Sequence, residues 1–198
     1  MLHAPDPTRA ATAPDAPLVL GLGGTMRFGS SSSRALEAAL GAARHAGVRT
    51  TLIAGPQLDL PAYDVAAPRT AAAERLIDAV RRADGLIIAS PSYHGGISGL
   101  LKNALDHLEE LRGDARPYLH DRPVGLIATG DGWQGPNATL QALRLTVHAM
   151  RGWPTPLGVA HNISEGGVEG ARAALELVGR QVAERVLRDA RDRAAVAA

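Results

Sequence analysis

Five short apolar runs alternate along the chain with five longer segments of helical period, and this alternation limits the possible folds. The runs are rich in Val, Ile and Leu, and continuous apolar strands of this kind are typical of a parallel sheet buried on both faces. The sequence therefore predicts a doubly wound α/β fold, a five-stranded parallel sheet with helices on both faces. The expected strands are 18–24, 48–54, 85–91, 123–130 and 153–160, and the expected helices are 31–46, 69–83, 98–112, 137–151 and 167–195.

The rest of the chain gives no indication of a second domain. Its 198 residues, 45% of them hydrophobic, suit one domain of ordinary size. We expect a folded domain over 17–198, preceded by a disordered Pro/Ala-rich leader over 1–16. The start lacks the basic and apolar regions of a signal peptide, and no apolar run approaches the ~18 residues that span a bilayer. We therefore expect a cytoplasmic location.

Charge and composition exclude several classes of function. The formal net charge is +1 and the arginines are scattered, so neither nucleic acid nor an anionic membrane is expected as a partner. The chain contains no cysteine, which excludes disulfides, thiolate nucleophiles and thiolate metal sites. The histidines show no spacing of the H-E-x-x-H type, and we expect no metal site.

Three loops are expected at the carboxyl ends of the strands, where doubly wound sheets bind ligands. They are 23–32, 90–98 and 129–136, called here the first, second and third loops. The first loop fits neither common nucleotide motif. Met26 stands where G-x-G-x-x-G requires its third glycine, and Ser30 stands where the P-loop requires lysine.

The first loop nevertheless contains the groups that bind a phosphate. It combines several hydroxyls and one arginine with the amino end of a predicted helix, which suits a terminal phosphate monoester. Thr25, Ser30 and Ser32 would donate hydrogen bonds, and Arg27 would add positive charge. The alternative is a serine-capped helix after a flexible turn, in which the hydroxyls only satisfy backbone groups.

The second loop and the helix after it contain a specific motif, P-x-Y-x-G-x-x-x-G-x-L-K-N-x-[LI]-D. With G-[ST]-x-R-x-x-S in the first loop, it resembles the NADPH-dependent FMN reductase family of flavodoxin-like quinone, azo and chromate reductases, over about 17–185. This resemblance implies a flavodoxin-like fold that binds FMN and uses NADPH. The matching positions are Gly24, Thr25, Arg27, Ser30, Pro91, Tyr93, Gly95, Gly99, Leu101, Lys102, Asn103, Leu105 and Asp106.

The resemblance also implies an enzyme. Hydride would pass from reduced nicotinamide to bound flavin and then to a quinone, free flavin or similar small acceptor, and the flavin would supply the redox chemistry. The alternative is a flavodoxin-like FMN-binding electron-transfer module, against which the low negative charge argues. A homodimer or homotetramer is expected. The sequence determines neither the acceptor nor the preference between NADPH and NADH.

In the second loop, the resemblance assigns the flavin ring to the turn formed by Pro91, Ser92, Tyr93, His94 and Gly95. Glycine at 95 carries no Cβ that would block the approach of the backbone to the ring. We expect Tyr93 and His94 to flank the ring, and His94 to assist proton transfer because its ordinary pKa lies near neutrality. Alternatively, Tyr93 packs against its own helix. Lys102, Asn103 and Asp106 are expected to be structural.

In the third loop, Thr129, Gly130 and Gly132 are expected to bring backbone amides to the opposite edge of the ring. A carboxylate at that edge would disfavour an anionic reduced flavin, so we expect Asp131 to point away. Trp133 would either cover the rim of the ring or contact a neighbouring subunit.

Overall fold

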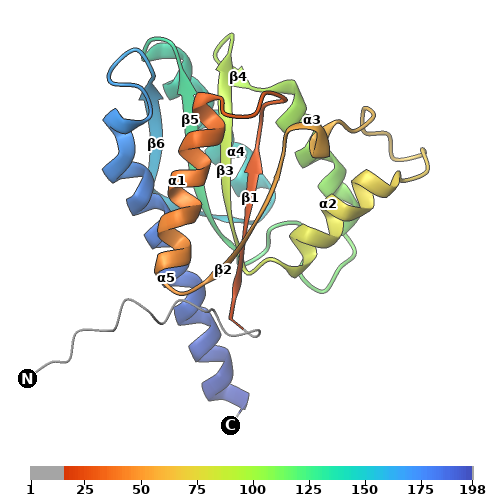
Figure 1. Ribbon diagram of the computed structural model, residues 1–198. Coiled ribbons are helices and arrows are strands. Elements are labelled where there is room, and N and C mark those ends of the chain that lie inside the picture. Colours follow the sequence, from red (N-terminus) through yellow and green to blue (C-terminus); the bar gives the residue numbers. More distant parts are fainter. Residues whose placement is uncertain (1–15, 198) are drawn as a thin grey trace, which may run out of the picture.

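Five parallel strands form the sheet in the order β2-β1-β3-β5-β6, and β4 pairs antiparallel with the end of β3 (Figure 1). The computed structural model describes residues 16–197, so most of the predicted leader lies outside the described residues. Discounting the short β4, this is the 2-1-3-4-5 order of flavodoxin-like folds, as expected. The strands are β1 (Leu18–Gly23), β2 (Arg49–Ala54), β3 (Gly85–Tyr93), β4 (Gly96–Ile97), β5 (Pro123–Gly130) and β6 (Trp153–Asn162).

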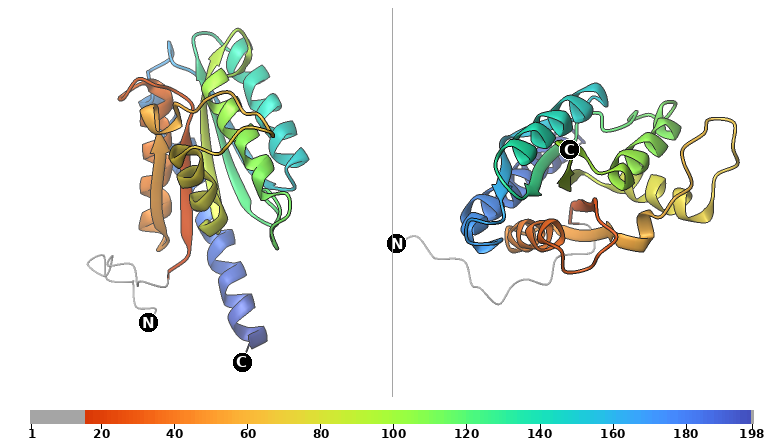
Figure 2. Two further views of the ribbon diagram at one scale, coloured as in Figure 1. Left: turned by 90° about the vertical axis from the view of Figure 1, so that its right-hand side faces the viewer. Right: turned by 90° about the horizontal axis from the view of Figure 1, so that it is seen from above.

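Helices cover both faces of the sheet (Figure 2). On one face, α1 (Ser31–His45) and α5 (Arg172–Ala197) enclose a core that includes Leu36, Ile87 and Val178. On the other face, a second core is enclosed by α2 (Ala71–Arg82), α3 (Gly99–Asp106) and α4 (Gln134–Ala149). Short 3-10 helices occupy Gly55–Leu58, His107–Leu111 and Glu169–Ala171.

A glycine lets α5 approach α1 closely. A Cβ added at Gly179 would lie only 2.0 Å from the carbonyl oxygen of Ala39, which belongs to the α1 backbone. The two helices therefore touch through their backbones at this point. This contact fixes α1 against the sheet, and with it the amino end of α1 next to the first loop.

Three helices differ from the prediction by more than two residues at one end. The third predicted helix changes to a 3-10 helix after Asp106, and the last begins at Arg172 rather than at 167. The fourth begins at Gln134, three residues earlier than predicted, and includes Pro136 in its first turn. Proline is tolerated there because the first N–H groups of a helix have no partner within it.

The hairpin formed by β3 and β4 is a feature that the sequence analysis missed. β3 continues to Tyr93 and turns back through His94 and Gly95, whose φ angles are +52° and +77°. Two successive residues with positive φ are typical of a type I′ turn, whose twist matches that of a hairpin. The conformation of Gly95 therefore follows from the turn.

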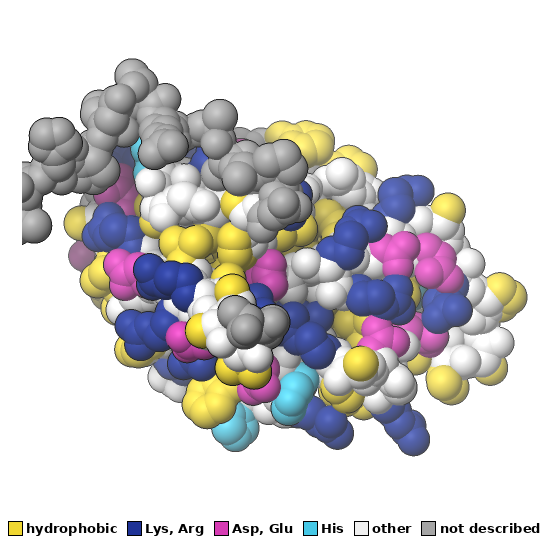
Figure 3. Space-filling model, turned by 90° about the horizontal axis from the view of Figure 1, so that it is seen from below, with side chains coloured by type: hydrophobic (Ala, Val, Ile, Leu, Met, Phe, Trp, Pro, Cys, Tyr) yellow, Lys and Arg dark blue, Asp and Glu magenta, His cyan; other side chains and the backbone are white. Residues whose placement is uncertain are grey.

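The opposite, amino-terminal edge of the sheet presents charged side chains of both signs among its described residues (Figure 3). Viewed from below, basic side chains are interspersed with acidic ones (Figure 3). Within residues 16–197, no helix has both the length and the apolar character needed to cross a membrane.

Candidate functional site

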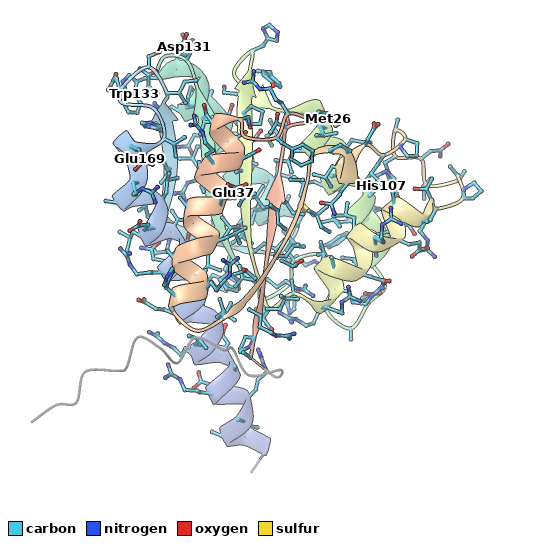
Figure 4. All side chains as sticks on the ribbon, viewed as in Figure 1. Met26, Glu37, His107, Asp131, Trp133 and Glu169 are labelled. Atoms are coloured by element: carbon cyan, nitrogen blue, oxygen red, sulfur yellow. The ribbon has the colours of Figure 1, made fainter. Side chains whose placement is uncertain are left out.

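A cavity of about 610 Å³ lies at the carboxyl ends of β1, β3 and β5. The strand order reverses between β1 and β3, which is where a ligand is expected in this fold. In Figure 4, Met26 and Asp131 mark two sides of this upper edge of the molecule. The lining residues are Gly24, Thr25, Met26, Arg27, Ser30, Ser31, Ser32, Pro91, Ser92, Tyr93, Ser98, Gly99, Leu100, Thr129, Gly130, Asp131 and Ile163.

Ser30 of the first loop caps α1, and the amino end of α1 faces the cavity. Ser30 is the N-cap, and its Oγ accepts a hydrogen bond of 3.2 Å from the N–H of Ser33. The capping alternative is thus correct for Ser30. It does not compete with anion binding, because Ser31 and Ser32 in the first helical turn also line the cavity. N–H groups at this position have no partner within the helix and suit an anion.

Ser98, which the sequence analysis did not single out, joins the first loop to the second. Its Oγ donates to the carbonyl oxygen of Gly24 at 2.7 Å and accepts from the N–H of Leu101 at 3.2 Å, which caps α3. The N–H of Gly24 in turn donates to the carbonyl oxygen of Ala89 at 2.8 Å. A Cβ on Gly24 would lie 2.8 Å from the Ser98 Oγ, so this close approach requires glycine. A serine directly before the helix was the signal available in the sequence.

The second loop contributes Pro91, Ser92 and Tyr93 to the cavity. His94 and Gly95 are at the tip of the hairpin and are not among the lining residues, and the His94 side chain is exposed. The buried hydroxyl of Thr139 on α4 lies 2.8 Å from the Ser92 Oγ and fixes the base of the hairpin against α4.

Lys102, Asn103 and Asp106 of the motif contact their own surroundings rather than the cavity. The Nζ of Lys102 pairs with the Asp106 carboxylate at 2.7 Å on the exposed side of α3. The side chain of Asn103 forms three hydrogen bonds to the segment 60–63. Both observations agree with the structural roles expected for these residues.

The third loop contributes Thr129, Gly130 and Asp131 to the cavity. Asp131 is thus a lining residue, although we expected it to point away, and its carboxylate accepts a hydrogen bond from the Ser164 hydroxyl. Gly132 is not among the lining residues, and its N–H donates to the Asn162 Oδ1 at 2.8 Å. Trp133 is half-exposed and donates from Nε1 to Glu165 at 2.7 Å.

The donor set of the cavity fits a phosphorylated flat ligand. The lining combines hydroxyls, Arg27 and the amino end of α1 with apolar surface from Tyr93, Leu100 and Ile163. Such a site holds and orients a ligand by hydrogen bonds and contact area. Within residues 16–197, no group of three or more His, Cys, Asp or Glu side chains is placed to hold a metal ion.

Comparison with known proteins agrees with this site. The FMN-dependent NADPH-azoreductase of Staphylococcus aureus is 40% identical over 83 residues, which are 42% of this chain and 40% of the relative, so the match spans two fifths of the relative's length. An oxidoreductase structure from Corynebacterium diphtheriae aligns with a TM-score of 0.68 at 22% identity, and a flavodoxin, WrbA-like protein from Agrobacterium tumefaciens aligns with 0.60 at 19%. Each alignment covers 87% of this chain and 98% of the other, and both support a flavodoxin-like fold. The family model described as NADPH-dependent FMN reductase matches residues 17–165, and we conclude that the chain belongs to this family.

Proposed function

We propose that this protein is an FMN-dependent NAD(P)H oxidoreductase that reduces a quinone, free flavin or similar small acceptor. The observation that carries the proposal is the cavity, which joins the amino end of α1 to two backbone loops at the point where the strand order reverses. Membership in the NADPH-dependent FMN reductase family supports it. Bound FMN would accept hydride from reduced nicotinamide and pass reducing equivalents to the acceptor.

In this proposal, the domain over 17–198 binds FMN through its three loops. The first turn of α1, with Thr25, Arg27, Ser30 and Ser32, holds the phosphate. The proposal assigns no acid–base role to His94, because its side chain lies outside the cavity. The residues proposed to contact the ring are Pro91, Ser92, Tyr93, Thr129 and Gly130.

The first experiment is a titration of the apoprotein with FMN, followed by anaerobic mixing of the complex with NADPH or NADH. We expect a bound yellow chromophore and rapid bleaching to the two-electron level. FMN binding without bleaching by either nucleotide would favour the electron-transfer module instead. A protein without affinity for FMN would eliminate both redox functions. Steady-state rates over a panel of quinones, azo dyes and free flavins would then identify the acceptor.

Replacing Arg27 by alanine is expected to weaken FMN binding by one to two powers of ten. The side chain lines the phosphate side of the cavity, and losing one charge-assisted hydrogen bond costs about 1.5 to 3 kcal/mol. Fluorescence titration measures the change. Arg34→Ala, which removes an exposed arginine of α1 outside the cavity, is the matched control and should retain the affinity of the wild type. Equal affinity in the Arg27→Ala variant would remove this residue from the site.

The outer face of α3 and α4 supports a homo-oligomer. Leu145 on α4 is 73% exposed, and a groove beside it is lined by the apolar side chains of Leu105, Ala149 and Met150 together with polar ones, which include Lys102, Asp106 and Glu109. We propose that a second copy of the chain covers this mixed face, with Leu145 at its centre, in a homodimer, which is also the unit of a homotetramer.

We expect Leu145→Glu to shift the protein to a monomer, because the second copy would have to bury a carboxylate. Light scattering coupled to size-exclusion chromatography measures the mass. Leu177→Glu on α5, where Leu177 is 39% exposed, is the control and should leave the mass unchanged. A dimer that withstands Leu145→Glu would place the interface elsewhere.

We also propose a cytoplasmic location, where reduced nicotinamide is supplied.

A further inference from the structure

The third loop is held by a buried side chain that does not line the cavity. Asn162, at the end of β6, is 7% exposed. Its Oδ1 accepts hydrogen bonds from the N–H of Gly132 at 2.8 Å and from the N–H of Ser164 at 3.2 Å. One amide oxygen therefore joins the third loop to the loop that follows β6. The N–H of Ile163 adds a second link at 2.9 Å to the carbonyl oxygen of Gly130.

Glu165 favours the same orientation of the Asn162 amide as the two N–H groups that donate to its oxygen. The Asn162 Nδ2 donates to the Glu165 Oε1 at 3.0 Å, and the same oxygen accepts from the Trp133 Nε1 at 2.7 Å. An ionised carboxylate only accepts hydrogen bonds, so the amide must turn its NH₂ group toward Glu165. Its oxygen then faces the N–H of Gly132. Glu165 thereby connects Asn162 to Trp133, which follows directly after Gly132 in the third loop.

Packing alone does not fix the conformation of the third loop at Gly132. Gly132 has φ +77°, and a Cβ built on it would meet nothing within 4 Å. Glycine also loses more conformational freedom on ordering than any other residue. The hydrogen bond to Asn162 is thus a principal restraint on the backbone that directly follows the cavity-lining residues Thr129, Gly130 and Asp131.

We propose that Asn162, oriented by Glu165, is a positioning residue for the cofactor site. It holds the third loop in the one shape that presents Thr129 and Gly130 to the flavin ring. The inference rests on the proposed function, because it takes FMN as the ligand of the cavity. It adds residues from β6 and the following loop, outside the two motifs that indicated the site.

The test compares Asn162→Ala with Asn103→Ala, which also removes an asparagine that makes three side-chain hydrogen bonds to a neighbouring loop. Asn103 bonds to Leu60, Pro61 and Tyr63, and none of these residues lines the cavity. Hydrogen–deuterium exchange is measured first, on the apoproteins. We expect the amides of 130–133 to exchange about tenfold faster in Asn162→Ala and at the wild-type rate in Asn103→Ala.

FMN binding is measured next on the same variants. We expect the Kd of Asn162→Ala to rise about tenfold, and the visible spectrum and midpoint potential of its bound FMN to shift from those of the wild type. Asn103→Ala should keep the Kd, the visible spectrum and the midpoint potential of the wild type. If Asn162→Ala loses thermal stability as Asn103→Ala does but keeps the exchange rates, Kd and potential of the wild type, Asn162 is only structural and the proposal is overturned.

A charge-conserving exchange tests the role of Glu165. Asn162→Asp keeps the acceptor for Gly132 but places the new carboxylate opposite that of Glu165. The repulsion between the two should disturb the third loop and weaken FMN binding. Adding Glu165→Gln supplies an amide donor to the new carboxylate, and the double variant should recover most of the affinity. A double variant no better than Asn162→Asp alone would contradict the orienting role. If the wild type binds no FMN, the proposed function fails; if it binds FMN and Asn162→Ala binds it equally well, only this inference fails.

Discussion

Arg122→Met is expected to lower the free energy of unfolding by about 3 kcal/mol and the melting temperature by roughly 6 to 12 °C. Arg122 is 1% exposed, and its guanidinium donates to three backbone carbonyls, those of Ala83 at 2.8 Å, Tyr118 at 2.9 Å and Arg81 at 3.1 Å. Two of these carbonyls belong to the carboxyl end of α2, where a cation also meets the negative end of the helix dipole. Methionine fills similar space but leaves these carbonyls without this donor.

Two comparison variants isolate the effect of these hydrogen bonds. Burial, with a smaller effect from Arg116, lowers the pKa of Arg122 to about 10, so the group remains charged at neutral pH. Arg188→Met replaces an exposed arginine of α5 and should change stability by less than about 0.5 kcal/mol. Arg122→Lys keeps the charge but not the planar donor geometry, and we expect it to lose most of the stabilisation. If urea unfolding finds Arg122→Met as stable as Arg188→Met, the three hydrogen bonds contribute nothing net.

Arg122 also shows what the sequence does not reveal. The chain contains many arginines, and nothing in the residues around 122 distinguishes a buried one from those on the surface. The five parallel strands, by contrast, were predicted to within two residues at each end, because a continuous apolar run between helical segments has few other interpretations. The flavodoxin-like fold followed from the resemblance, and the strand order β2-β1-β3-β5-β6 confirms it.

The site was partly predictable for a similar reason. The carboxyl ends of parallel strands meet at one edge, so the residues after β1, β3 and β5 had to converge, and nine of the predicted residues line the cavity. His94, Gly95 and Gly132 do not, because local turns direct them elsewhere. Adjacency to Tyr93 in the sequence suggested a common position for His94, whereas the hairpin carries His94 beyond the cavity.

Single polar residues that hold the loops were missed because their partners are distant in the sequence. Asn162 bonds to Gly132 across 30 positions, and Ser98 bonds to Gly24 across 74. A single sequence contains no signal for such distant pairs, although the position of Ser98 before α3 does indicate its capping role. Ser31 carries a hydroxyl like its neighbours, but what sets it apart is its place as the first residue of α1, whose backbone N–H has no partner within the helix. The serine run does not show which of its members begins the helix.

Replacing Ser31 by aspartate is expected to weaken FMN binding by at least about a hundredfold while leaving the apoprotein equally stable or more so. Ser31 is the first residue of α1 and lines the cavity, and the first turn of α1 contains no acidic residue. A carboxylate there stabilises a helix by about 0.3 to 1 kcal/mol through the dipole. Toward a phosphate carrying a charge of about −1.5 to −2 a few ångströms away, the same carboxylate is repulsive by several kcal/mol.

The opposite effects of Ser31→Asp on helix stability and on phosphate binding distinguish a phosphate site from a helix end that is only capped. If α1 binds the phosphate, Ser31→Asp lowers FMN affinity much more than riboflavin affinity, because riboflavin lacks the phosphate. The uncharged Ser31→Asn variant should keep FMN affinity within a few-fold of the wild type. Thermal unfolding of the three apoproteins shows whether the fold is intact, and titration with both flavins measures binding. An equal loss for FMN and riboflavin in Ser31→Asp would mean that the aspartate blocks the ring, and that the phosphate lies away from the amino end of α1.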